Sequence, residues 1–172
     1  MTNQSTDFNL FGADALKAAF RRHASGVAII TASTKAGEPI GFTATSVTSL
    51  GSNPPLVSFN IAQGSSSYEH LVEGSSVAIH TLTIENLALS QKLAGPKEDR
   101  FKDIEYSLVS GVPVFPQTSS VLLGKVRTRL EVAANAVVVL DVISGFENTD
   151  AEPLLYYRRG YLTTGERLAD NF

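Results

Sequence analysis

Short runs of apolar, largely β-branched residues recur along the chain and are separated by turn-forming residues. Residues 27–32 form the first of these runs, and the turn sequence KAGEP at 35–39 closes it. Two longer runs nearer the C-terminal end flank a turn that we expect at 133–135. This pattern predicts β-strands at 27–32, 40–50, 56–61, 76–82, 121–132, 136–146 and 154–157.

Three other segments have the spacing or the end signals of helices. In the first, four apolar residues recur on one face of a helix: Ala13, Leu16, Ala19 and Phe20. In the second, Ser66 and Glu69 have the S-x-x-E spacing of a capping box, and in the third Thr83 stands where a capping residue belongs. We therefore expect helices at 13–23, 66–73 and 84–93.

The expected strands outnumber the helices and do not alternate with them. Such a pattern favours a mainly β (α+β) fold, a small antiparallel barrel with peripheral helices. A doubly wound nucleotide-binding fold is disfavoured, because the chain contains neither G-x-G-x-x-G nor G-x-x-x-x-G-K-[ST]. A length of 172 residues is typical of a single domain.

Composition narrows the chemistry further. The chain has no cysteine, which excludes disulfides, thiolate metal sites and cysteine nucleophiles, and its three scattered histidines make a metal site unexpected. The net charge of −3 comes from interspersed residues, so we expect no nucleic-acid partner. No run is apolar for the roughly 18 residues that a membrane span needs, and the first residues do not resemble a signal peptide. We therefore expect no membrane association and a cytoplasmic location.

Small hydroxylated residues occupy successive positions in the segment 41–49 (GFTATSVTS). A half-buried strand would alternate more cleanly, so this strand could line a flat, polar heterocycle. Taken alone, the stretch is explained at least as well by a barrel strand whose threonines serve β-propensity.

Three further segments could bind a ligand. The serines of 63–67 precede an expected helix start, where free amides and hydroxyls suit a terminal phosphate, although Ser66 could equally serve only as a cap. The charged loop 97–101 could carry cations toward that phosphate or be a solvated connection. The aromatic and arginine residues of 156–161 could stack on rings or pack against a second subunit.

No nucleophile elbow G-x-S-x-G occurs, and no histidine has an obvious acidic partner of the kind that a catalytic triad requires. The residues therefore favour a site in which a cofactor supplies the reactivity.

Seven segments, taken in order and spacing, resemble the flavin reductase-like family, whose small members hand reduced flavin to flavin-dependent monooxygenases. The resemblance extends over about residues 16–162. The matching segments are 20–32, 41–46, 53–57, 65–67, 93–95, 99–101 and 153–157.

The resemblance implies an antiparallel Greek-key split β-barrel with peripheral helices, a single domain over 1–172 with its core at about 16–162, and a homodimer. It implies FMN or FAD as cofactor and NADH or NADPH as co-substrate, with hydride passing directly to the flavin, so that no catalytic acid, base or metal is assigned. The flavin-binding residues are then expected to be Thr43, Ala44, Thr45, Ser46, Asn60, Ile61, Ala62, Ser65, Ser66, Ala94, Gly95, Phe101 and Tyr157. On the nicotinamide side we expect Asn135, Arg158 and Tyr161.

One position departs from the family pattern. Family members commonly have a Gly-x-His turn between the two long strands, whereas this chain has AAN at 133–135. The amide of Asn135 can donate a hydrogen bond but cannot carry a charge. The favoured interpretation is an NAD(P)H-dependent flavin reductase that supplies a partner monooxygenase. The alternatives are a flavin carrier or sensor without useful turnover, and a split-barrel flavin oxidase.

Overall fold

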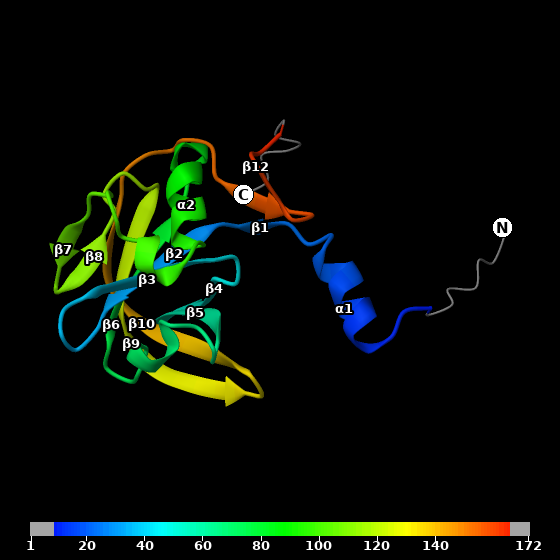
Figure 1. Ribbon diagram of the computed structural model, residues 1–172, viewed down its shortest axis with the longest axis horizontal. Coiled ribbons are helices and arrows are strands. Elements are labelled where there is room, and N and C mark those ends of the chain that lie inside the picture. Colours follow the sequence, from blue (N-terminus) through cyan, green and yellow to red (C-terminus); the bar gives the residue numbers. More distant parts are fainter. Residues whose placement is uncertain (1–8, 166–172) are drawn as a thin grey trace.

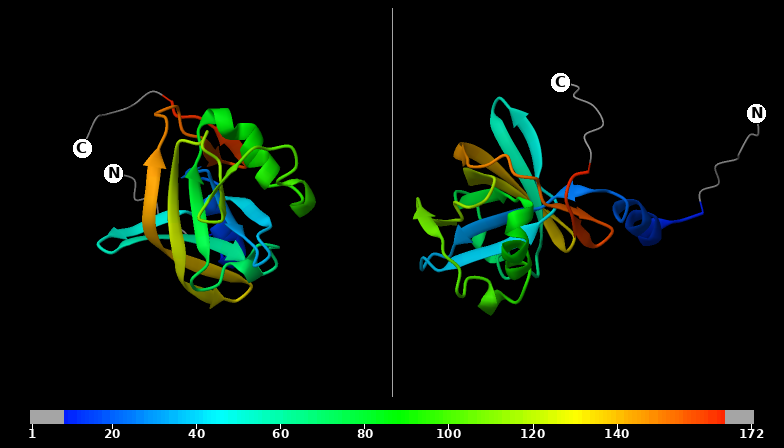
Figure 2. Two further views of the ribbon diagram at one scale, coloured as in Figure 1. Left: turned by 90° about the vertical axis from the view of Figure 1, so that its left-hand side faces the viewer. Right: turned by 90° about the horizontal axis from the view of Figure 1, so that it is seen from above.

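The body of the protein is a seven-stranded antiparallel sheet. The computed structural model describes residues 9–165. The strand order is β3-β2-β6-β9-β10-β5-β4. The bounds are β2 (Ala28–Ser33), β3 (Pro39–Ala44), β4 (Thr48–Ser52), β5 (Pro55–Ala62), β6 (Ser76–Thr81), β9 (Ser120–Val132) and β10 (Asn135–Glu147). Only residues 45–47 separate the two edge strands β3 and β4, so the sheet curls into a barrel that is split between them (Figures 1 and 2).

Smaller elements surround the barrel. A second sheet has the order β1-β11-β12, and a separate hairpin pairs β7 with β8. The short helix α2 packs against β2 and β3, whereas α1 projects away from the body of the protein (Figure 1). The bounds are α1 (Gly12–Phe20), β1 (Ser25–Gly26), α2 (Leu87–Leu93), β7 (Ser107–Val109), β8 (Val112–Val114), β11 (Leu155–Tyr157) and β12 (Gly160–Leu162), with 3-10 turns η1 (Tyr68–His70), η2 (Ile84–Asn86) and η3 (Lys97–Asp99).

Two apolar clusters hold the architecture together. The barrel interior is filled from six strands by residues that include Ile30, Phe59, Val77, Val138 and Leu140. The second cluster lies on the other side of β2 and joins it to α2 and the C-terminal segment through Val27, Ile29, Leu82, Leu93, Phe115 and Leu154. Strand β2 is thus buried on both faces, which explains why the run 27–32 is continuously apolar and does not alternate.

The expected mainly β antiparallel barrel is confirmed, and most strand positions agree to within a residue or two. The single strand expected at 40–50 is wrong, because the chain turns away after β3 and re-enters the sheet at its other edge as β4. The first helix is shorter than expected and ends at Phe20. The sequence did not predict β7, β8 or β12.

The helix expected at 66–73 is also wrong, since only the single turn η1 forms there. Arg129 of β9 explains this outcome. Its Nη1 donates hydrogen bonds to the carbonyl oxygens of Tyr68 (2.9 Å) and Leu71 (3.2 Å), which a longer helix would use for its own next turn. The capping box of Ser66 and Glu69 does not form, whereas the Thr83 amide does donate to Asn86 Oδ1 (2.9 Å) at the start of η2 and α2.

His80 is a core residue with no exposed surface. Its Nε2 accepts a hydrogen bond from the Phe115 amide (3.2 Å), so Nδ1 carries the proton and donates to the Ile29 carbonyl oxygen (3.1 Å). Burial lowers the pKa of His80 from 6.5 to about 4. His80 is therefore a neutral side chain that links the backbone of β2 to the backbone of Phe115.

Within residues 9–165, no three histidine, aspartate or glutamate side chains are grouped so that they could bind a metal ion. The same part of the chain holds no helix of the length and apolarity that crossing a membrane requires.

Candidate functional site

The break between β3 and β4 is fixed by Ser46. Its Oγ accepts a hydrogen bond from the backbone amide of Asn60 in β5 (3.0 Å). This bond holds residues 45–47, the crossing segment between β3 and β4, against β5. A cavity of about 540 Å³ lies beside this point, and Thr45, Ser46, Asn60 and Tyr157 all line it. Four of the residues expected to bind flavin, from three separate parts of the chain, thus line one cavity.

A second, smaller cavity of about 210 Å³ lies at the opposite end of β3. It is lined by Pro39, Ile40, Gly41, Ser66, Ser67, Lys97, Glu98, Arg100 and Phe101. The lining contains two cations and one carboxylate together with two serine hydroxyls. This combination suits a phosphate group.

The loop that supplies these cations is folded onto β3 by Gly41. A Cβ at this position would lie 2.9 Å from the Ile30 carbonyl oxygen and 3.1 Å from the Phe101 ring, so only glycine lets the ring come this close. Arg100 fastens the loop by donating from Nε to the Gly95 carbonyl oxygen and from Nη1 to that of Gly41, both at 2.9 Å. Burial lowers the pKa of the Arg100 guanidinium, which nevertheless keeps its charge at neutral pH.

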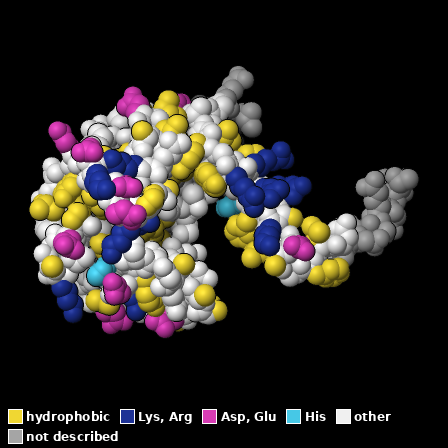
Figure 3. Space-filling model, in the orientation of Figure 1, with side chains coloured by type: hydrophobic (Ala, Val, Ile, Leu, Met, Phe, Trp, Pro, Cys, Tyr) yellow, Lys and Arg dark blue, Asp and Glu magenta, His cyan; other side chains and the backbone are white. Residues whose placement is uncertain are grey.

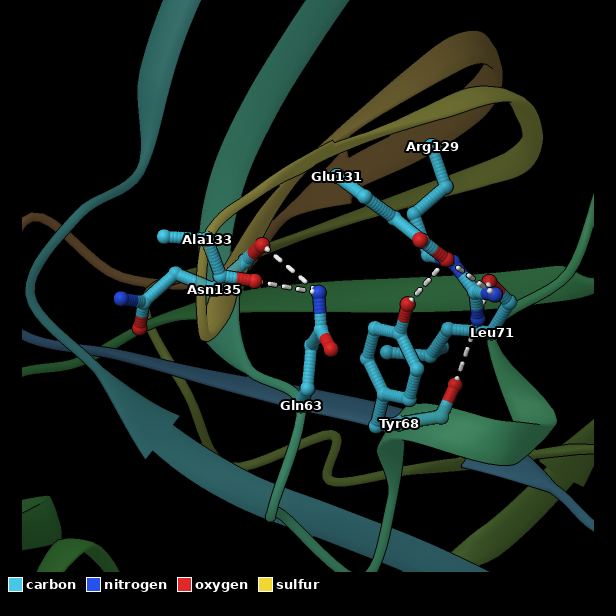
Figure 4. Close-up of polar contacts among 7 residues, drawn as sticks. All are labelled: Gln63, Tyr68, Leu71, Arg129, Glu131, Ala133 and Asn135. Carbon is cyan, nitrogen blue, oxygen red and sulfur yellow. Dashed lines mark hydrogen bonds and ion pairs between the residues drawn. The ribbon is translucent and has the colours of Figure 1, made fainter.

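The serine loop 65–67 is held from both ends by the hairpin of β9 and β10 (Figure 4). On one side Gln63 Nε2 donates to the Ala133 carbonyl oxygen (2.8 Å) and more weakly to that of Asn135 (3.4 Å). On the other side the Tyr68 hydroxyl donates to Glu131 Oε1 (2.6 Å), and this hydrogen bond raises the pKa of Tyr68.

The Arg129 guanidinium lies 3.9 Å from the centre of the Tyr68 ring, in the same cluster, and adds a cation–π contact to its two backbone hydrogen bonds. The serine loop is therefore placed by contacts with a hairpin more than 60 residues away rather than by a helix of its own.

The expected site residues divide into two groups. Those that line one of the two cavities are Thr45, Ser46, Asn60, Ser66, Phe101, Tyr157 and Arg158. The others line neither: Thr43, Ala44, Ile61, Ala62, Ser65, Ala94, Gly95, Asn135 and Tyr161.

The structure gives several of the second group other contacts. Ile61 and Ala44 belong to the barrel core, so their side chains are not available to a ligand in either cavity. The Thr43 hydroxyl donates to the Ser90 carbonyl oxygen (2.6 Å), and the Tyr161 hydroxyl accepts from Ser90 Oγ (3.2 Å). Both side chains are thereby tied to α2.

Sequence reasoning did not connect Lys17, Arg21 and His23 with the larger cavity. These basic residues line it together with the expected residues and with Arg159 of the segment 156–161. In the sequence, Lys17 and Arg21 are simply the polar face of a helix, and nothing in their spacing connects them with a segment about 140 residues later. Another cavity, of about 950 Å³ between α2 and residues 103–107, contains none of the expected site residues.

A family model described as "Flavin reductase like domain" matches residues 20–165. The chain belongs to this family. The match covers every expected site residue, so the resemblance inferred from the seven segments is confirmed.

Curated members of the family include proteins with named activities. "Probable flavin reductase" of Rhizobium meliloti is 36% identical over 155 residues, which make up 90% of this chain and 50% of that protein. "NADH:FMN oxidoreductase" of Rhodococcus erythropolis is 38% identical over 151 residues, 84% of this chain and 78% of that protein. "Flavin-dependent trigonelline monooxygenase, reductase component" of Acinetobacter baylyi is 28% identical over 162 residues, 90% of this chain and 50% of that protein. The chain thus spans about half the length of the first and third of these relatives.

Solved structures of the family have the same fold. A flavin reductase domain protein from Arthrobacter sp. FB24 aligns with a TM-score of 0.85 and 38% identity, over 91% of this chain and 98% of that chain. Flavin reductase HpaC complexed with NADP+ aligns with a TM-score of 0.79 and 28% identity, over 89% and 98% of the two chains. The split-barrel expectation is confirmed by these alignments.

Proposed function

We propose that this protein is an NAD(P)H-dependent flavin reductase that reduces FMN or FAD and supplies the reduced flavin to a partner monooxygenase. The observation that carries the proposal is the convergence of Thr45, Ser46, Asn60 and Tyr157 on one cavity and of Ser66, Lys97 and Arg100 on another at the opposite end of β3. The names of the relatives, which include an NADH:FMN oxidoreductase and the reductase component of a monooxygenase, support the same activity.

The two cavities fit the two ends of a flavin mononucleotide. Gly41 and Thr45 are four residues apart, about 13 Å along an extended strand, a span that a ring and its ribityl chain can bridge. The hydroxyls and cations of the smaller cavity suit the phosphate. The larger cavity offers the Asn60 amide, two hydroxyls and an aromatic face, which suit a polar ring system.

A bound flavin supplies the redox chemistry by accepting hydride from a nicotinamide. The protein's own residues bind and orient. Ser66, Lys97 and Arg100 hold the phosphate end, and Ser46, itself fixed by Asn60, places the crossing segment beside the ring. Because hydride transfer needs alignment of two rings and no acid or base, the proposal assigns no catalytic acid or base to this chain.

Titration of the purified protein with FMN, followed by flavin fluorescence, tests the binding half of this proposal directly. Saturable binding is expected, and riboflavin should bind more weakly because it lacks the phosphate. A titration that shows no binding of FMN would refute the proposed site.

We also infer that the protein forms a homodimer. Helix α1 has no buried residue and stands apart from the barrel (Figure 2, right). Phe11, which directly precedes α1, and the α1 residues Leu16 and Phe20 are 76%, 60% and 64% exposed. An apolar helix face of this kind is usually covered, and a second copy of the chain would cover it.

Light scattering is therefore expected to give the mass of a dimer at micromolar concentration. Replacing Phe11 and Leu16 with aspartate should shift the protein toward monomer, because the charged helix face can no longer be buried. The exposed pair Ser49→Asp and Ser52→Asp on β4 serves as a charge-matched control. A monomer mass for the unaltered protein would contradict the inference.

Asn135 provides a further test of the reductase activity. Its side chain is exposed at the first position of β10, and Gln63 bonds only its backbone oxygen, so Asn135→His should leave the hairpin intact. We expect this substitution to raise turnover or nicotinamide affinity modestly, since an imidazole adds a cationic donor. FMN affinity, measured in parallel, should stay within about twofold because Asn135 lines neither cavity. A change confined to FMN affinity would place Asn135 on the flavin side instead.

A further inference from the structure

Four arginines from opposite ends of the chain meet at one place. Arg21 and Arg22 follow α1, and Arg158 and Arg159 form the turn between β11 and β12. Together they line a cavity of about 440 Å³. Figure 3 shows the corresponding concentration of Lys and Arg side chains where α1 joins the body of the protein.

The backbone at the second pair makes its arginines unusual. Tyr157 pairs with Gly160, so Arg158 and Arg159 form a two-residue hairpin loop, and their φ angles are +51° and +67°. Loops with two positive φ angles favour Asn-Gly, because a Cβ is disfavoured in the left-handed region. The turn thus carries two arginines at a cost to its own stability, which points to a use for their side chains.

The arginine cavity adjoins the proposed flavin-ring cavity, since Arg21, Arg158 and Arg159 line both. No aspartate or glutamate lines either of them. Within residues 9–165 none of the four arginines forms an ion pair with a carboxylate. In a chain of net charge −3, the positive charge is therefore concentrated at the mouth of the site, where it would attract a polyanion.

The geometry points to a binding site for the phosphate groups of the nicotinamide dinucleotide on Arg21, Arg22, Arg158 and Arg159. The inference rests on the proposed function: a nicotinamide stacked on a ring beside Thr45 and Ser46 leaves its pyrophosphate, one ribose away, at the adjoining cavity. Planar guanidinium groups donate pairs of hydrogen bonds to phosphate oxygens. NADPH, with a further phosphate, gains more from the cluster than NADH.

The decisive variant is Arg158→Asn combined with Arg159→Gly. It installs the sequence that the hairpin turn prefers, so the melting temperature should rise while two charges are lost. We expect KM for NADPH to increase about tenfold or more and KM for NADH to increase less. A loss of co-substrate affinity in a more stable protein cannot be attributed to damage to the fold.

Arg21→Gln combined with Arg22→Gln removes the other half of the cluster and should have the same direction of effect. Lys35→Gln combined with Lys125→Gln removes two surface cations that line neither cavity, and it should leave both KM values unchanged. Raising the ionic strength should increase KM for the unaltered protein and have much less effect on a variant that combines both double replacements and so lacks all four arginines.

Titration with inorganic pyrophosphate, followed by NMR chemical shifts, separates this inference from the proposed function. The unaltered protein should bind pyrophosphate, and both arginine double variants should lose that binding even if no turnover is observed. Unchanged pyrophosphate affinity and unchanged KM values in the Arg158→Asn, Arg159→Gly variant would overturn the inference. Weakened FAD binding with unaltered NADH and NADPH kinetics would overturn it as well, by assigning the arginines to the adenylate part of the flavin.

Discussion

Replacing Ser65 and Ser66 together with alanine is expected to weaken FMN binding about tenfold to a hundredfold while riboflavin binding changes less than about twofold. Ser66 lines the smaller cavity together with Lys97 and Arg100, and Ser65 is its immediate neighbour in the loop. Loss of hydroxyl donors from a charged acceptor costs about 1–3 kcal/mol, and only FMN has that acceptor. The measurement is a pair of fluorescence titrations with the two ligands.

The control for this experiment is Ser49→Ala combined with Ser52→Ala, two exposed serines of β4 outside both cavities. It should leave both affinities unchanged. The melting temperature must also be compared, because Ser65 Oγ accepts a hydrogen bond from the Ser67 amide (3.4 Å). Equal losses of affinity for FMN and riboflavin would contradict the assignment of the phosphate to the serine loop.

Acidification is expected to destabilise the protein by about 3 kcal/mol between pH 6.5 and pH 4 through His80 alone. The pKa of His80 is about 4 in the folded protein and 6.5 in the unfolded chain. As the pH falls through this window, the unfolded chain takes up the proton first, so stability is complete above pH 6.5 and declines toward pH 4. Urea unfolding at a series of pH values measures the decline.

Other groups titrate in the same window, so the His80 contribution is isolated by comparison. His80→Gln should be less stable at pH 7, because two buried hydrogen bonds are disturbed, and its stability should fall less steeply on acidification. His23→Gln, at an exposed histidine, should keep the slope of the unaltered protein. Identical slopes for the His80 variant and the unaltered protein would contradict the assigned pKa.

The strands of the barrel were predictable because their signal is local. The continuous burial of β2 and the long apolar runs of β9 and β10 are visible in the sequence as β-branched and apolar residues between turn signals. The break after Ala44 was not predictable, because Ser46 leaves the strand to bond with Asn60 on β5. The missing helix at 66–73 has a similar cause, since Arg129 takes two of the carbonyl oxygens that a helix requires.

In the candidate site, too, the features with a local sequence signal were predictable and those that depend on contacts between distant segments were not. The small residues around Gly41 and the serines of 65–67 signalled a ligand site from the sequence, and the family resemblance extended them to Asn60 and Tyr157. Arg21 and Arg158 line the same cavity because α1 leaves the barrel beside the β11–β12 turn. No local sequence pattern predicts this arrangement. The side chain of Ile61 points into the core, because a strand that borders a cavity still turns every second side chain inward, and the resemblance alone does not say which residues of 60–62 have side chains facing the cavity.

The most direct test of the proposed reductase activity is the oxidation of NADH and NADPH by the purified protein, with and without added FMN, followed through the absorbance of the reduced nicotinamide. We expect oxidation that depends on added flavin, saturates with both substrates and is abolished or strongly reduced when Ser65 and Ser66 are replaced at low FMN concentration. A protein that binds FMN but oxidises neither nicotinamide, either unaltered or as Asn135→His, would contradict the account and favour a flavin carrier or sensor.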